Sequence, residues 1–245
     1  MRSKRSFIAH RSHAFFNPIS ENKIQKIISE LKLPQNASVI DIGCGNGELL
    51  YRIAQQYKIH GTGVDICEAS LQLATKRNKD VKNMQFVESD GKDFLEKIAD
   101  SSLDLIICTG SSHALGGYKA ALSMISSRVK KHGQIIFAEG YWRQKPHSEY
   151  LTFLQATEGD YNSHCENIEL ATEQNLIPLY SYTASTEDFD NYEWLYSRSI
   201  EDYALEMPED KDNEGMLAHI RAWRKHYLKY GRATLGFGIY LYRVM

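Results

Sequence analysis

The chain has 245 residues and a formal net charge of -2. This charge balance gives no basic field that would attract a nucleic-acid backbone, and no apolar run approaches the roughly 18 residues that span a bilayer, so we expect neither a nucleic-acid nor a membrane partner. The length suits a single α/β domain with additions.

The start of the chain is predicted to be a tail followed by one helix. Residues 1–11 are locally basic, and we expect a solvated and partly disordered tail there. Isoleucine and leucine residues at helical spacing then predict a helix over residues 21–32, with Ser20 as its N-cap.

A glycine-rich turn follows the first predicted strand. The β-branched run at residues 39–42 is typical of a buried parallel strand, and residues 48–57 have the apolar spacing of a helix. Gly43, Gly45 and Gly47 lie between them, where the backbone needs positive φ angles and a ligand needs close approach. A nucleotide-type ligand at the helix N-terminus is therefore expected.

Two more strands are predicted to end in acidic residues. Residues 59–65 form a strand pattern that ends at Asp65, and residues 84–90 form one that ends at Asp90. Helices are predicted after each, over residues 70–78 and 93–98. Asp65 lies 20 residues beyond Gly45, a distance at which a carboxylate binds ribose hydroxyls.

The alternation of strands and helices continues to about residue 138. The predicted elements are a nearly continuous apolar strand over 103–109, a small-residue loop over 110–117, a helix over 118–129 and a strand over 134–138. Such alternation implies a parallel sheet with right-handed crossovers. Ligands of these sheets bind outside the carboxyl ends of the strands.

The last hundred residues depart from simple alternation. The predicted elements are helices over 147–157 and 167–175, a strand over 177–183, helices over 188–206 and 213–230, and a last strand over 235–244. Aromatic residues are frequent between residues 186 and 231. At helical spacing these aromatics suit the packing of the insertion's own helices, a dimer contact, or the wall of a substrate chamber.

The D-x-G-x-G-x-G pattern from Asp41 to Gly47, with acids after the next two strands, resembles the class I S-adenosylmethionine-dependent methyltransferases. A dinucleotide fingerprint would instead carry its third glycine at position 48, which is Glu48. The resemblance implies an α/β fold with a seven-stranded, mostly parallel sheet, helices on both faces, an antiparallel last strand and a helical insertion between strands six and seven.

The same resemblance implies one methyltransferase domain over residues 1–245. Its expected parts are an N-terminal tail and helix (1–37), a cofactor-binding core (38–140), further helices and the sixth strand (141–184), a helical insertion or lid (185–232) and the last strand (233–245). In this family the segment before the first helix often folds over the cofactor or acceptor site. Phe15 and Phe16 are the residues here that would do so, or that would simply pack onto the core.

The implied cofactor is S-adenosylmethionine, with S-adenosylhomocysteine as its product. By resemblance, Asp65 binds the ribose, Asp90 lies at the adenine amino group and Asp41 lies near the methionine part. The full set of expected cofactor-binding residues is Asp41, Gly43, Cys44, Gly45, Gly47, Asp65, Ile66, Asp90, Gly91 and Thr109.

The expected reaction is in-line transfer of the methyl group to a small-molecule acceptor. The loop over 110–117, the stretch over 139–146 and the aromatic insertion look similar to uncharacterised small-molecule methyltransferases of bacteria. If the acceptor must lose a proton, His113 and Glu139 are the candidate bases. Each also has a structural interpretation, as a turn cap for His113 and as a backbone or lid contact for Glu139. The expected acceptor-binding residues are Tyr141, Trp142, Arg143, Tyr192 and Trp194.

Several alternatives stay open from the sequence. In the first, the methyl acceptor is a protein or an RNA. In the second, the chain is a module that binds the cofactor without catalysis. In the third, the chain is a nicotinamide-dependent oxidoreductase. A homodimer is a further alternative for the surface of the insertion. The four cysteines are widely separated, so we expect no metal site, and reduced thiols suit a cytoplasmic protein.

Overall fold

Seven strands form one mixed sheet in the computed structural model, which describes residues 2–245. The strands are β1 (Ala37–Ile42), β2 (Ile59–Asp65), β3 (Met84–Glu88), β4 (Leu103–Thr109), β5 (Val129–Trp142), β6 (Leu176–Thr183) and β7 (Leu235–Val244). Their order across the sheet is β3-β2-β1-β4-β5-β7-β6, and β7 runs antiparallel to both of its neighbours. The predicted fold class is confirmed.

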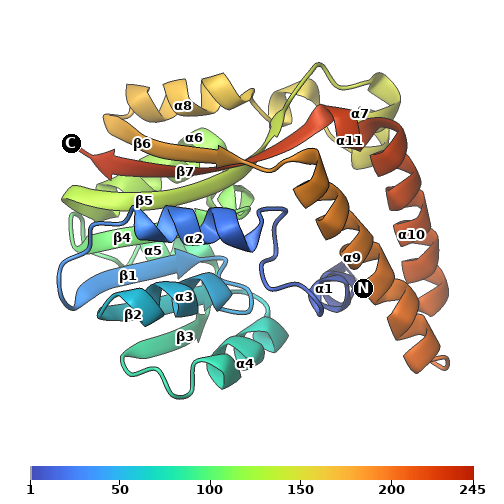
Figure 1. The fold of residues 1–245 in the computed structure, drawn as a ribbon, viewed down its shortest axis with the longest axis horizontal. Helices are drawn as coiled ribbons and strands as arrows, with labels where there is room; N and C mark the ends of the chain where they lie inside the picture. Colours follow the sequence, from blue (N-terminus) through green and yellow to red (C-terminus); the bar gives the residue numbers. More distant parts are fainter. Residues whose placement is uncertain (1) are drawn as a thin grey trace.

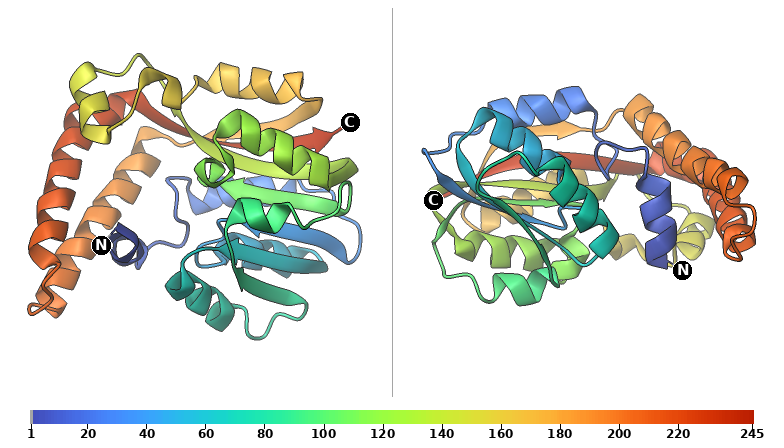
Figure 2. Two further views of the ribbon diagram at one scale, coloured as in Figure 1. Left: turned by 180° about the vertical axis from the view of Figure 1, so that it is seen from behind. Right: turned by 90° about the horizontal axis from the view of Figure 1, so that it is seen from below.

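Helices cover both faces of this sheet (Figures 1 and 2). They are α1 (Arg2–His10), α2 (Glu21–Ser29), α3 (Glu48–Gln56), α4 (Glu68–Arg77), α5 (Gly91–Leu95), α6 (Tyr118–Arg128), α7 (Ser148–Leu154), α8 (His164–Glu173), α9 (Thr186–Glu206), α10 (Asn213–His226) and α11 (Arg232–Thr234), with a π-helical turn over Tyr227–Gly231. One apolar core lies between the sheet and α2 and α3, and a second lies between the sheet and α5, α6 and α8. Across residues 2–245, none of these helices combines the length and the apolar character needed to cross a bilayer.

β5 is much longer than the predicted strand over residues 134–138. Its last residues stay in the sheet because they pair with the start of β7, with Gly140 opposite Phe237 and Tyr141 opposite Gly236. A Cβ atom at Gly236 would collide with the Tyr141 ring, so the glycine lets this ring lie flat across the neighbouring strand. Tyr141 and Trp142 therefore belong to a strand that continues beyond residue 138, where the predicted strand ended.

The prediction of a disordered N-terminal tail was also wrong. The structure has helix α1 there, and Ile8 and Ala9 are buried against apolar residues of α9 and α10. Two basic residues of this region have acidic partners far along the chain: Lys4 pairs with Asp210 at 2.7 Å and Arg11 with Glu206 at 2.6 Å. Neutralised charge and buried apolar surface together hold the segment in place.

Helices α1, α9 and α10 form a unit that we call the helical cap. They stand beside the carboxyl ends of the parallel strands, with α1 between the sheet and α9 (Figures 1 and 2). The cap has its own small apolar cluster, separate from the two cores of the sheet. Its place in the fold brings the N-terminal helix and the helical insertion to the edge where ligands of such sheets bind.

Candidate functional site

The turn between β1 and α3 is built by three glycines with positive φ angles. Gly43, Gly45 and Gly47 have φ values of 71°, 52° and 70°. A Cβ atom at Gly45 would lie 2.8 Å from the ring of Phe16, and one at Gly43 would overlap the Ser111 side chain. The N-terminal segment and the loop after β4 thus approach the turn from different sides, and side chains at these glycines would push them away.

Asp65, at the end of β2, is oriented toward this turn. One carboxylate oxygen accepts a hydrogen bond from the Gly45 backbone N–H at 2.8 Å, and the other accepts one from the Cys67 N–H at 2.8 Å. Each carboxylate oxygen can still accept a second hydrogen bond. The next side chain, Ile66, is 73% exposed, which leaves an apolar surface beside a fixed carboxylate.

Asp41, at the end of β1, is buried close to Asp65. One of its carboxylate oxygens is buried without a hydrogen-bond partner among the residues described. Burial, with a smaller effect from the Asp65 charge, raises the pKa of Asp41 to about 8. Its neighbour Cys44 is also buried, and burial raises the pKa of this thiol, so Cys44 fills the turn as an uncharged side chain.

Asp90 and Gly91 begin helix α5. Asp90 caps this helix by accepting hydrogen bonds from the backbone N–H groups of Lys92 at 2.8 Å and Asp93 at 3.2 Å. Gly91 is buried, and a Cβ atom there would lie 2.8 Å from Ile42. Asp90 therefore has a structural role in addition to any contact with a ligand.

Two adjoining cavities lie on the other side of the loop after β4. The first, which we call the Glu139 cavity, has a volume of about 760 Å³ and is lined by residues of this loop, of the start of α6, of β5, of the segment between α7 and α8, and of α10. Among them are Gly110, Ser112, His113, Tyr118, Glu139, Tyr161, Asn162 and Trp223.

 The second, which we call the Arg5 cavity, has a volume of about 790 Å³ and is lined by Arg5, Ser6, Phe153, Tyr196 and His219. The two cavities share Leu154, Gln155 and Trp223 as wall residues, so they adjoin.

Glu139 is the carboxylate of the first cavity. It accepts a hydrogen bond from the Ser112 hydroxyl and another from the Gly140 backbone N–H at 2.9 Å. Burial raises the pKa of Glu139, although these hydrogen bonds and the charge of nearby His113 oppose the shift. The two predicted candidate bases therefore line one cavity, with Glu139 partly buried and His113 exposed.

The five predicted acceptor-binding residues have other surroundings. Tyr141 is buried beside His164, and the Trp142 indole donates a hydrogen bond to the Glu158 carbonyl at 2.8 Å. Arg143 donates one to the Ala184 carbonyl at 2.8 Å, which connects β5 to the start of α9. Trp194 is half exposed, with the Arg224 guanidinium over its ring.

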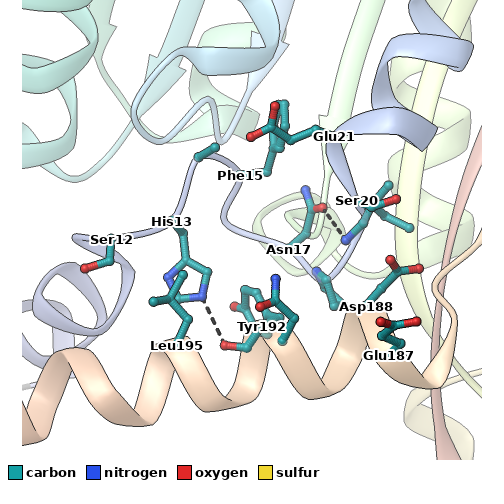
Figure 3. A pocket seen from close by; sticks show the side chains of 14 residues that line it. Ser12, His13, Phe15, Asn17, Ser20, Glu21, Glu187, Asp188, Tyr192 and Leu195 are labelled. Carbon is teal, nitrogen blue, oxygen red and sulfur yellow. Dashed lines mark hydrogen bonds between the residues drawn. The ribbon is translucent and has the colours of Figure 1, made fainter.

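Tyr192 lines a different cavity, of about 440 Å³, between residues 12–21 and helix α9 (Figure 3). Its hydroxyl lies 2.7 Å from the His10 ring, and its carbonyl lies 3.1 Å from the His13 ring. Tyr192 thus joins α9 to the N-terminal segment rather than to the Glu139 cavity.

Sequence reasoning missed several residues of the two adjoining cavities. Arg5 was assigned to a tail, and Tyr118 and Tyr161 gave no signal of a ligand contact. Trp223 was visible only as one of the many aromatics of the insertion. These residues come from four separate elements, so no local pattern of the sequence brings them together.

Comparisons with known proteins agree with this geometry. The family described as "Methyltransferase domain" matches residues 33–203. The uncharacterised protein YjhP of Escherichia coli is 24% identical over 241 residues, which cover 95% of each chain. Two solved structures have similar folds, both described as S-adenosylmethionine-dependent methyltransferases in complex with S-adenosylhomocysteine.

The first is from Geobacter sulfurreducens, with a TM-score of 0.89, 22% identity and coverage of 99% of this chain and 98% of that one. The second is from Thiobacillus denitrificans, with a TM-score of 0.87, 23% identity and coverage of 98% and 97%. The family match spans more than half of the chain, and the sheet has the strand order and the antiparallel β7 described above. The chain therefore belongs to the methyltransferase-domain family, and its fold is that of the class I S-adenosylmethionine-dependent methyltransferases.

Proposed function

We propose that this protein binds S-adenosylmethionine over the glycine turn and transfers its methyl group to a small molecule in the Glu139 cavity, leaving S-adenosylhomocysteine. The observation that carries this proposal is the position of the loop after β4. Ser111 of this loop contacts the turn at Gly43, while Gly110 and Ser112 line the cavity. A donor over the turn and an acceptor in the cavity would thus be neighbours across one loop.

The residues around the turn suit this cofactor. Asp65 has carboxylate oxygens oriented by backbone N–H groups and still able to accept from ribose hydroxyls. The exposed Ile66 offers an apolar surface for the adenine ring, and the unpartnered oxygen of Asp41 would accept from the amino group of the methionine part. When bound, S-adenosylmethionine supplies an electrophilic methyl group on a sulfonium centre.

The protein's contribution to the reaction is positioning and proton removal. Orienting two reactants is worth on the order of 7 to 11 kcal/mol, so no nucleophilic side chain is required. Glu139 is the group that would accept a proton from the acceptor, because it lines the cavity and burial raises its pKa above the ordinary value of a glutamate. Tyr161 and Trp223 are aromatic walls that would keep water from the acceptor.

The size of the cavity supports a small molecule over the macromolecular alternatives. Pockets for small molecules have volumes of roughly 300 to 1,000 Å³, and the Glu139 cavity has about 760 Å³. The net charge of -2 gives no support for an RNA acceptor. An open cavity beside the turn also favours an enzyme over a module that only binds the cofactor.

Calorimetry with S-adenosylhomocysteine tests the cofactor assignment. Each hydrogen bond to a charged group is worth roughly 1.5 to 3 kcal/mol, so Asp65→Ala should weaken binding about tenfold or more. Glu88→Ala is the matched control, because Glu88 is an exposed acid opposite Asp65 in the sheet register, and its replacement should leave affinity within about twofold. Equal affinity of wild type and folded Asp65→Ala, or tighter binding of NAD than of S-adenosylhomocysteine, would contradict the proposal.

A further inference from the structure

We infer that the methyl acceptor carries an amine at one end and an anionic group, a carboxylate or a phosphate, at the other. The amine would lie at Glu139 and the anionic group at Arg5. This inference rests on the proposed function, and it assigns to helix α1 the selection of the acceptor.

The Glu139 cavity has acidic walls that suit a cationic ligand. Its ionisable wall residues are Glu139, Asp160, His113 and two tyrosines, and neither lysine nor arginine is among the described residues that line it. The hydrogen-bond donors to Glu139 are a hydroxyl and a backbone N–H, both neutral. A protonated amine would supply the missing positive charge and would also interact favourably with aromatic faces such as that of Trp223.

The Arg5 cavity has the opposite charge. Within the part of the chain that the structure describes, the Arg5 Nε atom is buried without a hydrogen-bond partner, and Arg5 forms no ion pair. The neighbouring cations of the same segment are paired, Lys4 with Asp210 and Asp212 and Arg11 with Glu206. A buried guanidinium N–H without an acceptor lowers the stability of the folded protein. The planar guanidinium presents pairs of N–H groups whose spacing matches the oxygens of a carboxylate or a phosphate.

A single acceptor can reach both ends because the cavities adjoin. Trp223 is a wall of both, and its indole N–H donates to the Glu193 carboxylate at 2.6 Å, which fixes the orientation of the ring. Leu154 and Gln155 continue this shared wall. An amine and an acid joined by an aliphatic chain would lie along it.

The chemistry balances with these groups. Glu139 takes a proton from the ammonium form of the acceptor, which frees the nitrogen lone pair. That lone pair forms the new N–C bond while the C–S bond of the methyl donor breaks, and the bonding electrons stay on sulfur. The products are the N-methylated ammonium and S-adenosylhomocysteine.

Three probe series test the inference: ω-amino carboxylates of increasing chain length, ω-aminoalkyl phosphates, and n-alkylamines of matched length. Initial rates of S-adenosylhomocysteine formation give kcat and KM, and calorimetry with protein saturated with S-adenosylhomocysteine gives acceptor affinity. We expect the best anionic probe to have a KM about tenfold or more below that of its matched alkylamine. Whichever series shows this preference identifies the anionic group as a carboxylate or a phosphate.

Arg5→Ala should abolish that preference by raising the KM of the anionic probe about tenfold or more. The KM of the alkylamine and the affinity for S-adenosylhomocysteine should stay within about twofold. Arg11→Ala is the matched control, because Arg11 is a cation of the same segment whose partner is Glu206. Arg5→Met retains the aliphatic stem, so it should reproduce the Arg5→Ala result if α1 stays docked.

Other outcomes would overturn the inference. The inference fails if anionic probes and alkylamines have equal KM values, or if no probe binds to protein saturated with S-adenosylhomocysteine. It also fails if Arg5→Ala raises the KM of both kinds of probe equally, or if Arg11→Ala raises the KM of the anionic probe as much as Arg5→Ala does. In each of these cases the cofactor still binds and the proposed function stands. Failure of the wild-type protein to bind S-adenosylhomocysteine would instead contradict the proposed function itself.

Discussion

Asp41 and Asp65 show how one site treats two carboxylates differently. Asp65 receives two backbone hydrogen bonds and stays partly exposed, whereas Asp41 is buried and has one oxygen without a donor among residues 2–245. Burial disfavours the charged form, so the pKa of Asp41 rises to about 8. A buried carboxyl oxygen without a donor lowers the stability of the folded protein.

The Asp41 pKa predicts a specific pH dependence. The ordinary pKa of Asp41 is 3.8 and the folded value is about 8. Between these values the folded state binds a proton that the unfolded chain does not, so the free energy of unfolding should fall as the pH rises from about 4 to about 8. At roughly 1.4 kcal/mol per pKa unit, Asp41→Asn should raise the free energy of unfolding at pH 8 by about 2 kcal/mol or more.

Urea denaturation of the cofactor-free protein at pH 5 and pH 8 measures this effect. The stabilisation by Asp41→Asn should be present at pH 8 and much smaller at pH 5. Glu88→Gln removes an exposed carboxylate from β3, two strands away from β1, and should leave the pH dependence of the wild-type protein. An unchanged pH dependence in Asp41→Asn would show that Asp41 is ionised in the folded protein at neutral pH.

At the scale of elements, the segment between α1 and α2 joins the glycine turn to the helical cap. The Phe16 ring lies over Gly45 and stacks on the His10 ring, with centroids 4.6 Å apart. The Asn46 side chain donates to the Ala14 carbonyl at 3.0 Å, which fastens the segment to the turn. The segment therefore covers the turn from outside while α1 reaches the Arg5 cavity.

This arrangement predicts that Phe16 retains the cofactor. Phe16→Ala removes the ring over the turn, so S-adenosylhomocysteine should dissociate roughly tenfold faster, with a smaller change in the association rate. Stopped-flow displacement measures both rates. Phe153→Ala is the control: this ring stacks on His226 in the wall of the Arg5 cavity, so its loss should change acceptor KM and spare cofactor dissociation. Equal dissociation from wild type and Phe16→Ala would mean that the segment leaves the turn when the cofactor binds.

At the scale of the whole molecule, the sheet and the helical cap have different cores. Ile106 is fully buried in the core between the sheet and α5, α6 and α8, whereas Ile8 is buried in the separate cluster of the cap. A unit with its own small cluster opens at lower free energy than a central sheet. The side of the proposed acceptor site that α1, α9 and α10 form is thus expected to open more readily than the side that the sheet forms.

Hydrogen exchange can separate the two units. Ile106→Ala should lower the free energy of global unfolding by about 2 to 5 kcal/mol, with faster exchange in β1, β4 and β5. Ile8→Ala should speed exchange mainly in α1 and α9. It should lower the urea midpoint much less than Ile106→Ala does. Equal losses of global stability from the two variants would show that the cap and the sheet unfold together.

The sequence by itself determined the fold class and the residues around the glycine turn. A turn with three positive φ angles and acids at the ends of strands are encoded within a few residues, so Gly43 to Gly47, Asp65 and Asp90 could be placed without knowledge of distant contacts. The alternation of strands and helices similarly determined the sheet, and the antiparallel last strand followed from the family resemblance.

Only the tertiary structure decided the length of β5, the docking of α1 and the walls of the two adjoining cavities. β5 extends to Trp142 because β7 pairs with it from about a hundred residues away, and α1 forms where Asp210 and the apolar residues of α9 and α10 meet it. Arg5, Glu139 and Trp223 come together through the same packing. Such positions depend on surfaces far apart in the chain, whose energies no local pattern of residues contains.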